Sequence, residues 1–482
     1  MHKFLATLIM TALLAACAAG PDYRRPETPE PDSFTAAGSS AGMKSDERRF
    51  WQGFGDPMLS ELVETTLDAN QTLAGAVARY ERVAALLAGA RRDRWPSVTA
   101  GAGASEMRPS EVEQGTGPEE FETYEAGLAA EWELDLFGRL RRITESRRAE
   151  LQAAAADVDA VRVALVGQAA ASYFRLRGLQ QQLDVVRANV RLQEESLDIV
   201  TARVEAGRGT DFDRVRARAQ LERIRAELPA LDAEIRAAMH RIAVIAGQPP
   251  ARLVPWLSAP RELPDERPVI SPGTPGELLR RRPDIAAAER RVAAATARIG
   301  VASADLYPRF TLSGLLGTVA GDPGDLFSSG SESGLVALGI DWSFLDRGRV
   351  RARIDAADAE TREAIADYRQ AVLTALEATE TRLVRYQRSQ DRTARLESAV
   401  ASAERAVELA RTRFERGFID YFEVLAAEQE LVAARNNAVR SRTDEVLAMV
   451  DVYRALAGAP PEQIRTSRSH QRVEIPVPAA KQ

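Results

Sequence analysis

Cysteine and histidine, the residues of redox and soft-metal sites, are scarce in this 482-residue chain. There is one cysteine, Cys17, and there are three histidines, His2, His240 and His470. A single cysteine excludes an intrachain disulfide. The sequence contains no metal-binding Cys/His spacing, phosphate-binding loop or nucleophile elbow. Carboxylate pairs are common, but solvated helix faces explain them. We therefore expect no enzymatic activity, no cofactor and no metal.

The chain also lacks an excess of positive charge and long apolar runs. It has 64 basic and 70 acidic residues, a net charge of −6, which disfavours a nucleic-acid partner. After the apolar residues 4–14, no run approaches the ~20 residues that a membrane-spanning helix needs. If the protein crosses a membrane, we expect it to do so as a closed β-barrel.

The beginning of the chain carries a targeting signal. A short basic start, an apolar run and small residues predict a signal peptide over residues 1–16. The L-A-A-C sequence that ends at Cys17 resembles the bacterial lipoprotein box, in which the cysteine is lipidated and becomes the mature N-terminus. We predict lipidation, for example by palmitate, at Cys17; the alternative is an ordinary buried thiol. The residue after the cysteine is Ala18 and not Asp, which resembles the signal of lipoproteins that are sorted to the outer membrane rather than the inner membrane.

Half of the sequence repeats the other half. W-E-L-D-L-F-G-R-L at 132–140 returns as W-S-F-L-D-R-G-R-V at 342–350, and three further anchors recur in the same order with offsets of 210 to 212 residues. Such order indicates a duplication. We therefore divide the mature chain into five segments. They are a lipidated extended segment (17–56), a first repeat (57–249), a proline-rich linker (250–283), a second repeat (284–460) and a disordered tail (461–482).

Each repeat contains two stretches with the two-residue alternation of β-strands. We predict hairpins over residues 97–135 and 308–345, with strands of about ten residues, the length that a tilted strand needs to cross a bilayer. Trp132 and Trp342 lie at the ends of the returning strands, where amphipathic rings suit a membrane interface. A glycine six residues later, Gly138 or Gly348, lets the chain turn into a helix. The alternative is a soluble β-sandwich whose sheets each have one solvent-exposed face.

Four strands are too few to form a transmembrane barrel alone. Eight is the smallest usual number, and open strand edges in lipid are prohibitively costly. We therefore expect the chain to share its barrel with copies of itself. Three copies give twelve strands, and two copies give eight.

Very long helices follow the strands in both repeats. We predict helical hairpins over residues 139–246 and 349–457, whose first helices are each ~100 Å long if continuous. Gly207 and Gly417 end these first helices as C′ glycines, so each hairpin has a tip far from the strands. On the helices alone, a coiled-coil stalk without a conduit is favoured, but a stalk does not need alternating strands at matching points in both halves.

The motifs together resemble the TolC-like outer-membrane efflux proteins, in particular the NodT-type lipoprotein branch. The resemblance spans nearly the whole mature chain and rests on C-A-A-G-P-D-Y-R-R-P (17–26), F-W-Q-G-F-G-D-P-M-L-S-E-L (50–62), P-G-E-L-L-R-R-R-P-D-I (275–285), W-S-F-L-D-R-G-R-V and the R-F-E-R-G tip (413–417). It implies a mainly α-helical homotrimer. Its twelve-stranded outer-membrane β-barrel continues into a twelve-helix periplasmic α-barrel.

The resemblance also implies partners and site residues at the tips. A periplasmic adaptor protein and an inner-membrane pump, of the RND type, dock there and supply the energy for export of small molecules. Many relatives have an aspartate where this chain has Ala426, so we expect a plug of Phe422 instead, with negative charge from Asp211, Asp420 and Glu423. Solvated turn residues are an equal alternative for these carboxylates. The residues that match the adaptor-docking tips are Arg203, Gly207, Arg413 and Gly417.

Two other functions remain open at this point. A channel that secretes proteins has the same architecture as an efflux channel. A structural coiled-coil lipoprotein is a further alternative from a different class.

Overall fold

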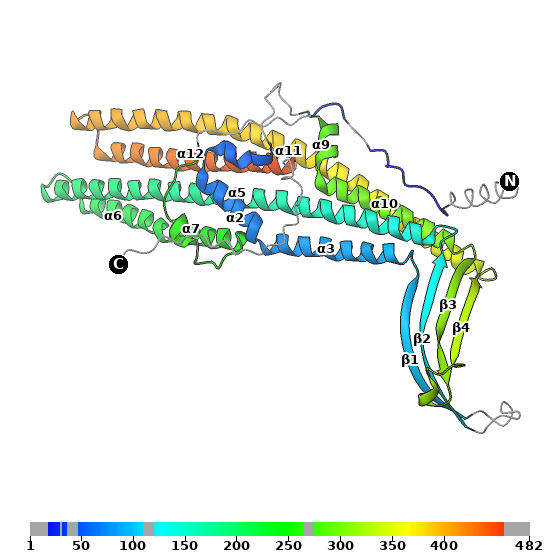
Figure 1. Ribbon diagram of the computed structural model, residues 1–482. Coiled ribbons are helices and arrows are strands. Elements are labelled where there is room, and N and C mark those ends of the chain that lie inside the picture. The colour runs from blue at the N-terminus through cyan, green and yellow to red at the C-terminus, as the bar shows by residue number, and fades with distance from the viewer. Residues whose placement is uncertain (1–17, 29–30, 36–46, 109–119, 265–273, 457–482) are drawn as a thin grey trace.

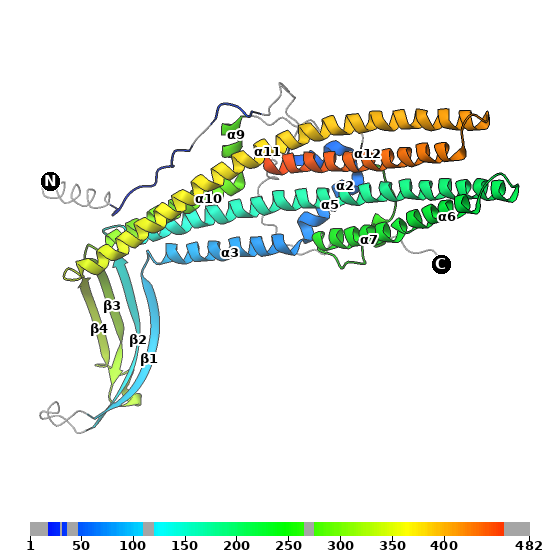
Figure 2. The same cartoon turned by 180° about the vertical axis from the view of Figure 1, so that it is seen from behind.

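The computed structural model describes residues 18–28, 31–35, 47–108, 120–264 and 274–456. Long helices lie side by side, and a small sheet extends from one end of them at an angle to the helix axes (Figures 1 and 2). The segment before the first repeat contains η1 (Glu47–Phe54). The first repeat contains α2 (Pro57–Ala69), α3 (Gln71–Arg92), β1 (Ser97–Met107), β2 (Phe121–Leu134), α5 (Arg139–Glu205), α6 (Asp211–Arg225) and α7 (Glu227–Ile245). The connection contains α8 (Val254–Leu257) and α9 (Pro275–Arg281). The second repeat contains α10 (Pro283–Ala304), β3 (Arg309–Ala320), η2 (Pro323–Asp325), β4 (Glu332–Asp341), α11 (Arg347–Glu415) and α12 (Tyr421–Ala455).

The two hairpins form one antiparallel sheet in the order β1-β2-β3-β4. Its register aligns Val98 with Ala130, Ala130 with Gly314, and Gly314 with Val336. Because successive side chains of a strand point to opposite faces, this register places the even-numbered residues of all four strands on one face. The alternating apolar residues of the two repeats thereby join in a single surface.

The first helix of each predicted hairpin is continuous, with 67 residues in α5 and 69 in α11. At 1.5 Å per residue each is ~100 Å long. Their return segments differ. In the second repeat α12 is one helix of 35 residues, whereas in the first repeat the return is divided into α6 and α7 at Ala226. Pro229 explains the break, because it has no N–H to donate to the carbonyl of Arg225.

The main core lies midway along the helices, where α2, α5, α7 and α12 meet. Tyr173 and Phe174 of α5 are fully buried there, and they pack with apolar residues of the other three helices. The Arg177 guanidinium is also buried. It donates hydrogen bonds to the Ala259 carbonyl at 2.8 Å and to the Gln180 side chain at 2.6 Å. A charged donor thus fixes the chain after α8 to this core.

The expected fold class is confirmed: the chain is mainly helical and has two repeats of the same layout. Before β1 the chain forms two helices, α2 and α3, because the Asn70 side chain caps the second by accepting a hydrogen bond from the Leu73 N–H. No helix among the described residues is both long enough and apolar enough to cross a membrane.

Candidate functional site: the open sheet, the corners and the helical tips

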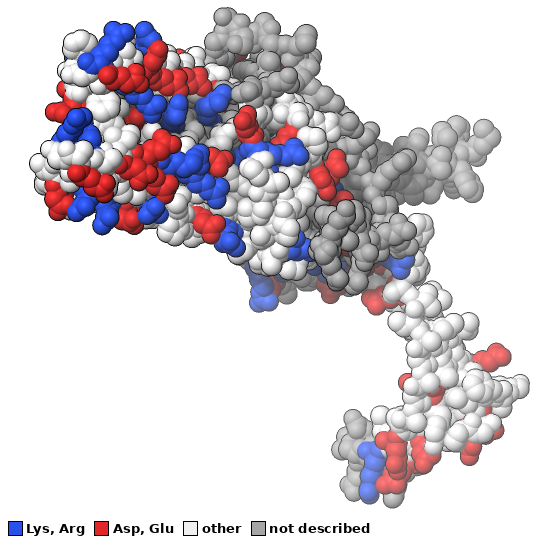
Figure 3. Space-filling view, turned by 90° about the vertical axis from the view of Figure 1, so that its left-hand side faces the viewer, with Lys and Arg blue, Asp and Glu red and all other residues white. Residues whose placement is uncertain are grey.

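The sheet presents an apolar face that nothing in the described chain covers. The exposed fraction of Val336 is 80% and that of Leu316 is 72%. The same face carries further exposed apolar side chains, namely those of Val98, Leu128, Leu312, Leu338 and Ile340. In Figure 3 the sheet is mainly uncharged with scattered acidic residues, whereas the helical part is densely covered by both signs of charge. An exposed apolar surface of this extent marks a surface that binds a partner or a membrane.

Both edges of this sheet are open. Within the described residues, β1 pairs only with β2 and β4 pairs only with β3. The outer edges therefore present rows of backbone N–H and C=O groups that a further strand can satisfy.

The repeated tryptophans fix the corner between helix and strand. The Trp132 indole N–H donates to the Arg94 carbonyl at 3.0 Å, and the Trp342 indole N–H donates to the Leu306 carbonyl at 3.1 Å. Each carbonyl lies two residues before the proline that precedes the strand, Pro96 or Pro308. Each tryptophan thus ties the end of a returning strand to the preceding helix. Where these two rings lie relative to a membrane stays a prediction.

The two glycines of the repeated phrase play different roles. Gly138 has φ of +83° and is the residue that precedes α5, so it provides the predicted turn. The prediction was wrong for Gly348. This residue lies in the first turn of α11, and its φ is not positive. Relative to the 210-residue offset, the second repeat enters its helix two residues earlier, with Asp346 at the N-cap position.

The helical tips end as the sequence predicts. Gly207 has φ of +70° and Gly417 has φ of +76°, a region that favours glycine. In the first tip the Arg208 N–H donates to the Arg203 carbonyl at 2.8 Å, and in the second the Phe418 N–H donates to the Arg413 carbonyl at 2.9 Å. These are Schellman caps. Capping therefore accounts for both glycines, and their part in adaptor docking stays a prediction.

The two tips of one chain contact each other. Arg203 at the end of α5 pairs with Asp420 before α12 at 3.7 Å, and its guanidinium lies 5.7 Å from the centre of the Phe414 ring. The Tyr421 hydroxyl donates to the Ser196 hydroxyl at 2.7 Å, and both side chains are buried. These contacts lock the start of α12 against α5.

The predicted gate residues take separate places on these tips. Phe422 is half-buried, and the Arg216 guanidinium of α6 lies 5.4 Å from its ring centre. Asp211 is exposed and pairs with Arg214 on its own helix. Glu423 is exposed too. The structure brings Asp420 to Arg203, but it does not gather the three carboxylates around Phe422 within one chain.

Arg413 is exposed, and its side chain makes no ion pair with the described residues. Ala426 is exposed on α12. Cys17 lies outside the described residues.

An ion pair between the exposed Arg411 and the buried Glu428, behind the second tip, was not anticipated from the sequence. Arg411 donates two hydrogen bonds to one oxygen of the Glu428 carboxylate, at 2.8 and 3.1 Å, and the other oxygen is buried without a hydrogen bond. Burial raises the pKa of Glu428, against the opposing effect of Arg411. Glu428 lies two positions after Ala426, so this tip has a carboxylate, but a buried one.

Comparison with known proteins gives one consistent result. The family model described as "Outer membrane efflux protein" matches residues 62–248 and 274–458. Nodulation protein T of Rhizobium leguminosarum bv. viciae is 33% identical over 77% of this chain and 76% of that protein. Toluene efflux pump outer membrane protein TtgI of Pseudomonas putida is 27% identical over 92% of this chain and 96% of that protein. The solved structure of the outer-membrane channel OprN is 38% identical, with a TM-score of 0.86 over 92% of this chain and 99% of that one.

Proposed function

The chain belongs to the outer membrane efflux protein family, and from that premise we propose that it is the outer-membrane channel of a tripartite efflux pump. Three copies join their sheets into a twelve-stranded barrel, and their helices extend the channel into the periplasm. The channel catalyses no reaction, because the energy for export comes from the pump.

The open sheet carries this proposal. Its four strands have two unsatisfied edges and one continuous apolar face. Lipid tolerates an apolar face but not an unsatisfied backbone edge, and closing the sheet on neighbouring copies removes both edges.

Ion conductance tests the channel directly. The purified full-length protein is added to a planar lipid bilayer, and we expect discrete conductance steps. The control is a variant with a two-residue insertion of Gly-Ser after Gly127, in the middle of β2, which disrupts the sheet while the helices stay intact. Intact trimers that insert into the bilayer but carry no current would contradict the proposal and favour a structural lipoprotein.

The proposed anchor is a lipid on Cys17, which holds the mature N-terminus in the outer membrane. Metabolic labelling with a palmitate analogue tests it. We expect the label on the wild type and its loss in Cys17→Ser. Equal labelling of the two proteins would refute the assignment.

The proposed partners are a periplasmic adaptor and an inner-membrane pump of the RND type, which meet the channel at its helical tips. The exposed Arg413, with Arg203, Gly207 and Gly417, forms the docking surface. The name of TtgI as part of an efflux pump supports such partners. Co-purification of the adaptor tests the surface: Arg413→Glu should reduce it, while Arg351→Glu, exposed near the other end of the same helix, should not.

The proposed gate is a narrowing at the tips, formed by Phe422 of each copy and by negative charge from Asp211, Asp420 and Glu423. The observation that supports it is that Phe422 is incompletely buried by its own chain. The variant Phe422→Ala should raise the conductance of the closed channel. Phe327→Ala, whose ring is 82% exposed in the loop between β3 and β4, is the matched control. Equal conductance of Phe422→Ala and the wild type would exclude the plug.

A further inference from the structure

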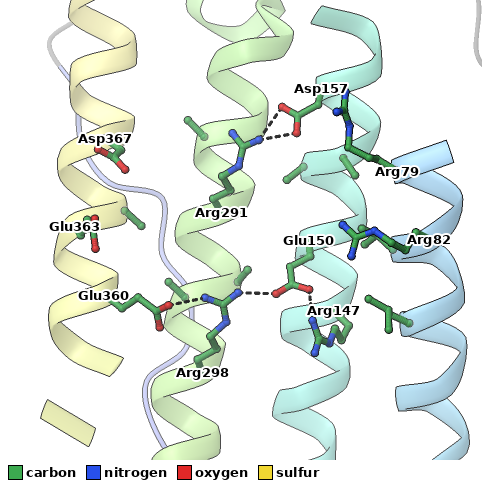
Figure 4. A pocket seen from close by; sticks show the side chains of 18 of the residues that line it. Arg79, Arg82, Arg147, Glu150, Asp157, Arg291, Arg298, Glu360, Glu363 and Asp367 are labelled. Atoms are coloured by element: carbon green, nitrogen blue, oxygen red, sulfur yellow. Dashed lines mark hydrogen bonds and ion pairs between the residues drawn. The ribbon is translucent and has the colours of Figure 1, made fainter. Parts of the chain in front are cut away.

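Four helices lie side by side in the order α3, α5, α10, α11, and one face of this layer holds a hollow of about 640 Å³ (Figure 4). Side chains of both charges line it: Arg79, Arg82, Arg147, Glu150, Asp157, Arg291, Arg298, Glu360, Glu363 and Asp367. A mixture of this kind can be a solvated surface without a role. The pairing of the charges indicates otherwise.

The inner two helices satisfy their charges with each other. Arg291 of α10 donates hydrogen bonds to both oxygens of Asp157 of α5, at 2.6 and 2.8 Å. Arg298 of α10 bridges Glu150 of α5 at 2.6 Å and Glu360 of α11 at 3.0 Å. Ion pairs thus cross every boundary that α10 shares with its neighbours.

The outer two helices each contribute to the hollow two charges that remain without an ion pair. Arg79 and Arg82 on α3 are exposed, and so are Glu363 and Asp367 on α11. None of the four makes an ion pair with any residue that the structure describes. Figure 4 shows Arg79 reaching from α3 toward Asp157, whose oxygens are bonded to Arg291. Around the hollow, the α3 side therefore carries unpaired positive charge, and the α11 side carries unpaired negative charge.

The internal repeat relates these charges to a pair that the structure already contains. Arg79 and Arg291 each stand 17 positions before the proline that precedes a strand, Pro96 and Pro308. Asp157 and Asp367 are related by the 210-residue offset of the repeated tryptophan phrase. The pair Arg291–Asp157 joins α10 to α5, so its repeat counterpart is Arg79 on α3 with Asp367 on α11. These two helices are at opposite edges of one copy and meet only between copies.

We propose that Arg79 of one copy forms an ion pair with Asp367 of the next copy, in the way that Arg291 pairs with Asp157 inside each copy. The inference rests on the proposed trimer. The Arg79–Asp367 pair closes a belt of charged residues around the helical barrel. Every copy contributes Arg79 of α3, Asp157 of α5, Arg291 of α10 and Asp367 of α11. Opposite charges alternate along the whole belt.

The charges of Arg82 and Glu363 agree with an antiparallel contact between α3 of one copy and α11 of the next. Arg82 follows Arg79 toward the strands, and Glu363 precedes Asp367 on the strand side of α11. Antiparallel contact of α3 with α11 therefore brings Arg82 to the level of Glu363. Inside the copy, the corresponding positions are occupied by Ala294 and Ala153, which are both buried. The contact between copies thus has a second pair of opposite charges where the contact within a copy has small apolar residues.

Thiol cross-linking tests this contact on the full-length protein. The variant Arg79→Cys/Asp367→Cys is treated with a short bis-maleimide and analysed on a denaturing gel. We expect covalent dimers and trimers, and their loss in each single-cysteine variant, which also controls for Cys17. The matched control is Arg79→Cys/Arg369→Cys, since Arg369 is exposed two residues after Asp367 and points about 200° away around the helix.

Each outcome decides a specific point. Bands in the first double variant alone support the belt. Monomers only, from a preparation that native gels show to be trimeric, overturn the Arg79–Asp367 contact and leave the proposed channel intact. Equal bands in both double variants overturn the predicted orientation of α11. A preparation that is not trimeric before cross-linking overturns the proposed function itself.

Discussion

The hydrogen bond between Tyr421 and Ser196 predicts how firmly the two tips are held together. The variant Tyr421→Phe keeps the ring, which packs edge-on to Phe414 with 5.2 Å between ring centres, and removes only the hydroxyl. That hydroxyl donates to Ser196 at 2.7 Å, and both side chains are less than 10% exposed. A buried hydrogen bond of this kind contributes about 1 kcal/mol.

The expected consequence is local, because the bond joins the first turn of α12 to α5. A loss of about 1 kcal/mol from local opening speeds amide hydrogen exchange about fivefold in the opened segment. We expect this acceleration in peptides covering residues 418–428, with no change around the core near Tyr173. In the proposed trimer, each copy has one such bond, and independent contributions add to about 3 kcal/mol for opening all three tips.

Hydrogen exchange measured by mass spectrometry checks this prediction. The control is Tyr80→Phe on α3, whose hydroxyl makes no hydrogen bond with the described residues. If Tyr421→Phe exchanges at the wild-type rate in residues 418–428, the bond does not hold the tips, and the reasoning fails.

Three further outcomes are expected. Trp342→Phe removes the indole hydrogen bond to the Leu306 carbonyl, which contributes about 0.5–1 kcal/mol per copy. It should therefore lower the temperature at which trimers dissociate on a gel. Trp95→Phe, at a residue that is 72% exposed, should leave this temperature unchanged. Gly417→Ala should lower the free energy of unfolding by about 1 kcal/mol, since it forces an alanine to positive φ. Gly348→Ala, inside α11, should leave the free energy of unfolding unchanged or raise it slightly. Chemical denaturation of the two variants measures both effects. Because burial raises the pKa of Glu428 above 4.5, its protonated form stabilises the fold at low pH, and this stability is lost as the pH rises through the raised value. Thermal unfolding of Glu428→Gln should therefore show a weaker dependence on pH than the wild type, and equal profiles would contradict the assignment.

The features that the sequence predicted are those with a local or periodic signal. The two-residue alternation located the two hairpins that contain all four strands. Gly207 and Gly417 were predicted as helix ends because a C′ glycine depends on its own φ and on the adjacent turn. The duplication was visible because its anchors keep their order and offset.

The features that were missed depend on contacts between distant segments. Tyr421 and Ser196 are 225 residues apart, and Trp132 bonds to a carbonyl 38 residues away. No pattern in the sequence alone specifies such pairs. Two features that were not predicted do have a signal in the sequence. Pro229 predicts the break between α6 and α7, and the Arg79–Arg291 correspondence follows from the same offset that revealed the repeat.

Native mass spectrometry of the full-length protein, extracted from membranes in detergent, tests the central claim most directly because it counts the chains in each particle. The account predicts particles of three chains, which supply twelve strands and leave no open sheet edge. Particles that contain one chain or two would contradict it.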